Sequence, residues 1–204
     1  MTNPTAHRAF SLIELLVSIA IIAIITGLSM AAYGKFTARA QNARCIELVH
    51  QVRTALEHLY QRDDVWPAAL QKTAANGDGM LDANAGAALS KAGVMLLTTS
   101  SSNPNSLTGH DRFGVVSPWA MDYITHHESA SLSSKLPAGG TIEQHILHFA
   151  IDLDYDGITE VDFGHDGGKA SVRAQACVWS YGRDGKKDTK DDIRSWSKGQ
   201  EVGK

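Results

Sequence analysis

The sequence predicts an α+β fold in which a long N-terminal helix packs on a small antiparallel β-sheet. Three observations support this prediction. Residues 15–32 form an apolar run of eighteen residues without a charge. An amphipathic stretch with helical spacing follows, and two segments in the C-terminal half alternate apolar and polar residues. The 43% hydrophobic content of the 204 residues suits one domain with an appended element.

The apolar run predicts a transmembrane helix over residues 10–33. Eighteen to twenty apolar residues reach across about 30 Å of hydrocarbon, and the run is longer than the roughly 7 to 15 apolar residues of a signal peptide. Arg8 and the titratable His7 lie immediately before it. The positive-inside tendency therefore predicts a cytoplasmic N-terminus, with the rest of the chain on the other side of the membrane.

The helix is expected to continue beyond the span. The sequence contains no proline between Pro4 and Pro67, so nothing breaks a helix that starts at Phe10 and runs to about Tyr60. Residues 34–62 are amphipathic, and an apolar stripe recurs every three or four residues along one side. Its members are Cys45, Val49, Val52, Leu56 and Leu59. This stripe predicts that the second half of the helix packs on a folded domain.

Glu14 is a single carboxylate at the start of the apolar run. A lone charge at membrane depth costs about 2.5 to 3.5 kcal/mol or more, so such groups are normally paired or functional. Two interpretations follow from the residues alone. Glu14 lies at the membrane interface and reaches water, or it meets a cation supplied by another molecule.

Residues 63–204 are expected to form a globular α+β domain. The segment 145–154 alternates apolar residues at 147, 149, 151 and 153, and the segment 171–181 does so at 172, 174, 176 and 178. A short helix is expected over about residues 84–93, followed by a loop over 98–111. Cys177 falls on the face opposite Val178, so Cys45 and Cys177 are predicted to stay as thiols, although a bridge between them is left open.

Composition and spacing argue against two functional classes. A net charge of −3 without a Lys/Arg block excludes nucleic acid as the main partner. His126, His127 and Glu128 lack the spacing of zinc hydrolases. On a strand, His145 and His148 would point to opposite faces and share no metal. Because no nucleophile–base pair is present, the chain is not expected to be an enzyme.

A first acidic segment, DLDYDG, places Asp152, Asp154 and Asp156 at alternate positions before Gly157. This is the opening of a calcium loop, in which alternate carboxylates converge and glycine permits the tight turn. The usual glutamate at the twelfth position is replaced by Phe163. The segment is therefore a candidate for a second, weaker calcium site, and the alternative is a solvated β-turn.

A second acidic segment lies near the C-terminus. Asp184, Asp191 and Asp192 flank a loop rich in glycine and lysine, and their carboxylates could wrap Ca²⁺ together with the backbone carbonyl of Tyr181. The alternative is an exposed hairpin end without metal. In that case the loop lysines neutralise the aspartates; they are Lys186, Lys187 and Lys190.

The N-terminal sequence A-FSLIELLVSIAIIAII resembles the signal of type IV pilins and type II secretion pseudopilins. The resemblance implies a leader over residues 1–9, cut between Ala9 and Phe10 by a prepilin peptidase, followed by methylation of the new amino group of Phe10. It also implies that Glu14 of one subunit meets the Phe10 ammonium of its neighbour during filament assembly. Ala9 stands where the family usually has glycine, and a proline common at the position of Ala31 is absent.

The C-terminal segment resembles the calcium loop of major pseudopilins, an S-x-G-x-D-G turn followed by D-D-I and a tryptophan. The matching residues are Ser180, Gly182, Asp184, Gly185, Asp191, Asp192, Ile193 and Trp196. The central region matches the family poorly, with SPWA at residues 117–120 where a DPWG turn is common. The resemblance implies a pilin-like lollipop with a helical stem and a calcium-binding head.

The function implied is that of a pseudopilin, most like the major subunit of a type II secretion system. Such a subunit is anchored in the inner membrane, is methylated, and stacks into a periplasmic filament with copies of itself. Minor pseudopilins and an inner-membrane assembly platform would be its further partners. A type IV pilus subunit for adhesion, motility or DNA uptake is the alternative within the family. A membrane-tethered enzyme or metal-binding module is the alternative outside it.

Overall fold

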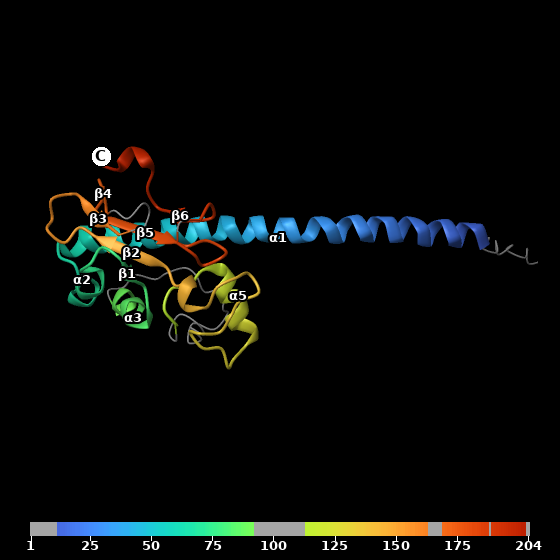
Figure 1. Ribbon diagram of the computed structural model, residues 1–204, viewed down its shortest axis with the longest axis horizontal. Coiled ribbons are helices and arrows are strands. Elements are labelled where there is room, and N and C mark those ends of the chain that lie inside the picture. Colours follow the sequence, from blue (N-terminus) through green and yellow to red (C-terminus); the bar gives the residue numbers. More distant parts are fainter. Residues whose placement is uncertain (1–11, 92–112, 163–168, 188, 203–204) are drawn as a thin grey trace, which may run out of the picture. The chain divides into compact units, whose positions relative to one another are not determined.

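The computed structural model describes residues 12–91, 113–162, 169–187 and 189–202 (Figure 1). Ala9, Phe10, the expected loop at 98–111 and Phe163 lie outside the described residues. The chain forms two compact units, residues 1–40 and residues 41–204. Each unit is described by itself.

The first unit consists of the N-terminal part of helix α1, which spans Leu12–Asp63 in full. Its apolar side chains are exposed, from Leu12 at 82% to Val17 at 49%. Serine and threonine hydroxyls bond the carbonyl four residues before them, as Ser18 Oγ does to Glu14 O at 2.7 Å. The helix is long and apolar enough to cross a membrane, judged by length and composition.

The second unit contains the rest of α1, and here one side of the helix is buried. The predicted stripe is confirmed, because each of its five residues is at most 1% exposed, and Leu48 joins it at 6%. The helix ends at Asp63, followed by Asp64 with φ of +53° and by Trp66–Pro67. Trp66 is buried, and its Nε1 donates to the carbonyl of Asp152 at 2.8 Å. The end of α1 is thereby tied to the turn after strand β2.

The strands form two antiparallel sheets. The larger sheet has the order β1-β2-β5-β6, and the smaller pairs β3 with β4. The strands span Gly79–Met80 (β1), His148–Ile151 (β2), Thr159–Val161 (β3), Ala170–Val172 (β4), Ala176–Ser180 (β5) and Ile193–Arg194 (β6). The sheets gather around the part of α1 that follows Gln41 (Figure 1). A long helix with small antiparallel sheets confirms the predicted α+β class.

The single strand predicted over residues 171–181 is wrong. The chain forms β4 and β5 there, and the residues between them turn, with Ala174 N donating to Val172 O at 2.9 Å. After the turn the chain pairs with a different strand. Strand β4 pairs with β3, whereas β5 pairs with β2 and sets Val178 opposite Phe149. Alternation at every second residue did not reveal this break, because Val172 of β4 and Ala176 and Val178 of β5 are all buried and continue the same pattern.

The two faces of the larger sheet enter different apolar clusters. Phe149, Ile151, Ala176 and Val178 join the main core, which also contains the buried side of α1. The intervening residues of β2 and β5 belong to a second cluster, with Ala150, Cys177, Trp179, Tyr181 and Trp196 among its members. The prediction that Cys177 faces away from the Val178 row is therefore confirmed.

Short helices complete the second unit. They are α2 (Ala68–Ala74), α3 (Ala83–Lys91), α5 (Pro118–His126) and the 3₁₀ turns η1 (Glu143–His145) and η3 (Lys198–Gln200). The helix predicted over residues 84–93 is α3, which begins one residue earlier. Pro118 begins α5 at a position where its missing N–H costs no hydrogen bond.

Candidate functional site

The C-terminal candidate site is the loop between β5, which ends at Ser180, and β6, which begins at Ile193. Two tight turns shape it, because Gly182 and Gly185 both have φ of +64°. A Cβ on Gly182 would lie 2.3 Å from the carbonyl oxygen of Asp191. Glycine is therefore required there for the two arms of the loop to approach each other.

The hydroxyl of Thr189 lies at the centre of this loop. Its Oγ1 is 2.5 Å from Asp191 Oδ1, and it is 3.3 Å from three further oxygens. These are Asp184 Oδ1, Lys186 O and Asp192 Oδ1. A hydroxyl carries one proton and can donate to one acceptor at a time. The loop thus gathers more oxygen atoms than this one hydroxyl can donate to. Oxygen atoms are the ligands that a hard cation such as Ca²⁺ prefers.

Asp191 is held ionised at the same place. Its Oδ2 accepts hydrogen bonds from the backbone N–H groups of Arg183 at 2.6 Å and Asp184 at 3.1 Å. Partial burial raises the pKa of Asp191, but the hydrogen bonds from Thr189 and from these backbone groups outweigh it and lower the pKa. The carboxylate therefore keeps its charge, as a metal ligand must.

Each of the three aspartates predicted for this site has a carboxylate oxygen within 3.3 Å of Thr189 Oγ1. In the described part of the chain, however, the aspartates whose carboxylate oxygens all lie within 4.8 Å of one another are Asp152, Asp154 and Asp156, and not these three. Thr189 and the carbonyl of Lys186 were not predicted from the sequence. A hydroxyl residue inside an aspartate-rich loop was a signal available in the sequence, but spacing alone did not favour it over its neighbours. The role of the Tyr181 carbonyl as a ligand stays a prediction.

The lysines of the loop do not neutralise its aspartates. In the described part of the chain, Lys187 is the one of the three that forms an ion pair, and its partner is Asp78, at 3.2 Å. Asp78 lies outside the loop, between α2 and β1. This arrangement disfavours the alternative in which Lys186, Lys187 and Lys190 replace a metal.

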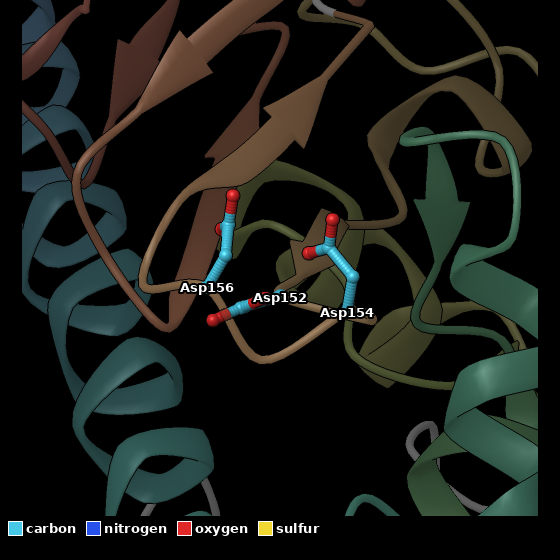
Figure 2. Close-up of side chains that lie close together, drawn as sticks. All are labelled: Asp152, Asp154 and Asp156. Carbon is cyan, nitrogen blue, oxygen red and sulfur yellow. The ribbon is translucent and has the colours of Figure 1, made fainter.

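The weaker candidate site is the turn after β2. Asp152, Asp154 and Asp156 each offer a carboxylate oxygen, and these oxygens lie within 4.8 Å of one another (Figure 2). Asp152 accepts from the backbone N–H of Tyr155 at 2.7 Å and of Gly157 at 2.8 Å. Burial and a hydrogen bond with Asp154 raise its pKa against these contacts. Because Asp152 already closes the turn by itself, this geometry also fits the solvated-turn alternative.

The remaining candidates have separate environments. His145 lies in η1 and not on a strand, so that expectation is wrong; its Nδ1 lies 2.9 Å from Ser117 Oγ and its Nε2 lies 2.9 Å from Gly139 O. His148 Nδ1 lies 2.6 Å from Asp78 Oδ1.

Cys45 and Cys177 are free and buried, as predicted. Burial raises the pKa of each thiol to about 12, which makes both unreactive.

The N-terminal candidates are placed only in part. Glu14 lies in the first turn of α1, where a carboxylate interacts favourably with the helix dipole. A family model described as the prokaryotic N-terminal methylation motif matches residues 5–30, which include Ala9, Phe10 and Glu14. The N-terminal segment of the chain is therefore type IV pilin-like.

Curated relatives support this assignment. The chain is 36% identical over 63 residues to the type IV major pilin protein PilE of Neisseria gonorrhoeae, covering 31% of this chain and 38% of the relative. It is 33% identical over 105 residues to a fimbrial protein of Neisseria meningitidis, covering 50% and 61%. The fimbrial protein EcpC of Eikenella corrodens is 36% identical over 62 residues, covering 30% and 40%.

These matches do not extend over whole proteins. The pilin-like chain spans between 29% and 61% of the length of the first relatives it matches. No solved structure matches the chain. These matches cover 30% to 50% of this chain, so the C-terminal loop is interpreted from its own geometry.

Proposed function

We propose that the pilin-like chain is a pseudopilin subunit that assembles into the periplasmic pseudopilus of a type II secretion system. The observation that carries this proposal is the oxygen-rich loop around Thr189, because it coincides with the pseudopilin-like C-terminal pattern and stands on the same chain as the methylation motif. The role of the subunit would be structural and not catalytic. The subunit would assemble with copies of itself, with minor pseudopilins and with an inner-membrane assembly platform.

Assembly starts from the N-terminus. A prepilin peptidase would cut between Ala9 and Phe10, and the amino group of Phe10 would then be methylated. The apolar helix would anchor the subunit in the inner membrane, with the leader in the cytoplasm and residues 63–204 in the periplasm. Glu14 of one subunit would pair with the Phe10 ammonium of the next, because pairing offsets the cost of placing each charge in an apolar filament core.

Calcium would bind in the C-terminal loop through Asp184, Asp191 and Asp192, with the Tyr181 carbonyl as a further ligand. The hydroxyl of Thr189 and the carbonyl of Lys186, which lie 3.3 Å apart, would be further oxygen ligands. When bound, the ion would cross-link the two arms of the loop and stabilise the native state. Asp152, Asp154 and Asp156 are the weaker second site.

A type IV pilus subunit remains the second candidate function. It is favoured by the relatives, whose names are those of pilins and fimbrial proteins. Deletion of the gene in its natural host separates the two functions. Loss of proteins from the culture medium supports the secretion function, whereas loss of surface filaments with normal secretion supports the pilus. A membrane-tethered metal-binding or enzymatic domain is the remaining alternative, and it predicts neither loss.

The assembly mechanism is tested by co-expression with a prepilin peptidase and by the Glu14→Ala variant. Intact-mass spectrometry should detect a chain that begins at methylated Phe10. Glu14→Ala should insert in the membrane normally and fail to enter filaments, because the neighbour's ammonium loses its partner. Ser18→Ala, one turn further along the same helix, is the matched control and should assemble. Only uncut chains, or normal filament yield from Glu14→Ala, would contradict the mechanism.

The calcium loop is tested by thermal unfolding of the full chain in detergent. At a calcium concentration a hundredfold above Kd, the ion stabilises the native state by about 2.7 kcal/mol, so a chelator should lower Tm by several degrees. Asp191→Ala should abolish this difference, whereas Asp154→Ala should reduce it only if the weaker site is also filled. A melting curve that a chelator leaves unchanged would remove calcium from the proposal.

A further inference from the structure

Asp78 connects the C-terminal loop to a part of the chain 109 residues away. Its Oδ2 lies 3.2 Å from Lys187 Nζ, and its Oδ1 lies 2.6 Å from His148 Nδ1. Burial raises the pKa of Asp78, but the contacts with His148 and Lys187 outweigh that effect and lower the pKa. One carboxylate thus binds a histidine of β2 and a lysine of the candidate calcium loop.

One oxygen of Asp78 is held by the sheet, independently of the loop. The ring of His148 stacks on Trp179 at a centroid distance of 5.7 Å and contacts Tyr181 at 4.5 Å. His148 and Trp179 are also paired across β2 and β5. His148 is 7% exposed, so it forms a firm support for the carboxylate. Asp78 is therefore held in place whether or not the loop carries an ion.

Lys187 is the cation best placed to compete with a metal. It follows Asp184 by three residues and precedes Asp191 by four, and its flexible four-carbon stem carries a mobile ammonium group. In the structure this ammonium lies 5.4 Å from the ring centroid of Tyr181 and contacts Asp78. Its printed partners are thus Asp78 and Tyr181, and not the oxygens around Thr189.

We propose that Asp78 holds Lys187 away from the loop carboxylates, and so keeps the Asp184–Asp191–Asp192 cluster open to a divalent cation. This inference rests on the proposed calcium loop. Asp78 acts as a positioning residue, since it would contact a competing cation and not the metal. Without it, Lys187 would pair with a loop carboxylate, and calcium would have to displace the ammonium before binding.

A different result is expected if the Asp78–Lys187 ion pair only stabilises the fold. If Asp78 only stabilises the fold, its replacement lowers the unfolding temperature and leaves the calcium affinity of the folded chain unchanged. If Asp78 keeps Lys187 away from the loop carboxylates, replacement of Asp78 lowers the calcium affinity, and removal of Lys187 restores it. A double-mutant cycle separates the two cases, because the restored affinity measures the coupling between the two residues.

The experiment is calcium titration calorimetry on the full chain in detergent, with the wild type, Asp78→Asn, Lys187→Met and the double variant. Asp78→Asn should weaken calcium binding about two- to fivefold, the range expected for a partly exposed ion pair. The double variant should bind at least as tightly as the wild type. Asp78→Glu keeps the charge and should keep most of the affinity. Asp122→Asn removes a carboxylate that bonds Gln41 instead, and serves as the matched control with unchanged affinity.

A second pair of variants tests the proposal without touching Asp78. Lys190 forms no ion pair with any described residue, so its full charge repels calcium, and Lys190→Met should strengthen binding more than Lys187→Met does. Equal gains from the two lysine variants would overturn the inference. So would unchanged affinity in Asp78→Asn, or a double variant as weak as Asp78→Asn. If the wild type itself binds no calcium, the proposed calcium loop fails first.

Discussion

Helix α1 has two regions in which apolar side chains differ in exposure: they are exposed in the first region and buried in the second. In the first unit Leu16 is 55% exposed and Ile22 is 62% exposed, whereas in the second unit Val52 and Leu56 are fully buried. Both regions are helical and both are rich in leucine, isoleucine and valine. The difference lies in where the apolar residues stand around the helix.

In the second unit the apolar residues form one stripe, and the charged residues occupy the other sides. A stripe can be buried by the chain's own sheet. In the first unit apolar residues cover all sides, so a single packed surface could not bury them. Nothing comes within 4 Å of a Cβ placed on Gly27 or Gly34. Among the described residues nothing buries this first region, whose helix is long and apolar enough to cross a membrane.

The sharpest test of this comparison replaces one leucine in each region. Leu56→Ala should destabilise the second unit by about 2 to 5 kcal/mol, because it leaves a cavity in the core. Leu16→Ala should leave that stability unchanged, since its side chain is 55% exposed and is not part of the core that the described residues form. Denaturant unfolding of the full chain in detergent measures both. Equal losses from the two variants would break the distinction between the regions.

A pair of glycines gives a smaller effect of the same kind. Gly114 has φ of +87°, and a Cβ there would lie 2.0 Å from the carbonyl oxygen of Leu81. Gly114→Ala should therefore cost about 1 to 3 kcal/mol, through strain in the left-handed region and a forced shift of the backbone. Gly27→Ala has open space around it and should instead raise helix stability slightly. Thermal unfolding and helix content by circular dichroism measure the two effects.

The sequence predicted the fold class well because its strongest signals are periodic. The stripe from Cys45 to Leu59 could arise only on a helix, and the alternation at 147–151 marked β2 correctly. The break between β4 and β5 escaped prediction because it depends on a change of strand partner, which no local pattern records. His145 was misplaced for the same reason, since the ends of a strand depend on pairing.

The candidate site was predicted in its charges but not in its geometry. Spacing identified Asp184, Asp191 and Asp192, because carboxylates close in sequence are restricted to one loop. It could not identify Asp78, which reaches the loop only through the antiparallel order of β1, β2 and β5. Contacts between residues far apart in sequence are set by topology. For the same reason the sequence alone did not exclude that the loop lysines neutralise the aspartates, because Asp78, the partner of Lys187, is far away in the sequence.

The smallest expected effect concerns His145, a buried side chain of the second unit. Burial lowers its pKa below the ordinary value of 6.5, although hydrogen bonding to Gly139 and the charges of Asp184 and Asp191 oppose the shift. Well above pH 6.5 the ring is neutral in both folded and unfolded chains. As the pH falls below 6.5 the unfolded chain takes up the proton first, so the stability of the second unit declines until the folded-state pKa is passed.

His145→Gln removes the titrating group and keeps a polar side chain that can bond to its neighbours. The variant should be less stable than the wild type at neutral pH, but its stability should change less between pH 6.5 and 5. His50→Gln on the exposed side of α1 is the matched control and should retain the wild-type pH profile. Chelator is present throughout, because calcium would add its own pH dependence through the aspartates. A His145→Gln profile parallel to that of the wild type would mean that the acid loss of stability arises from other groups.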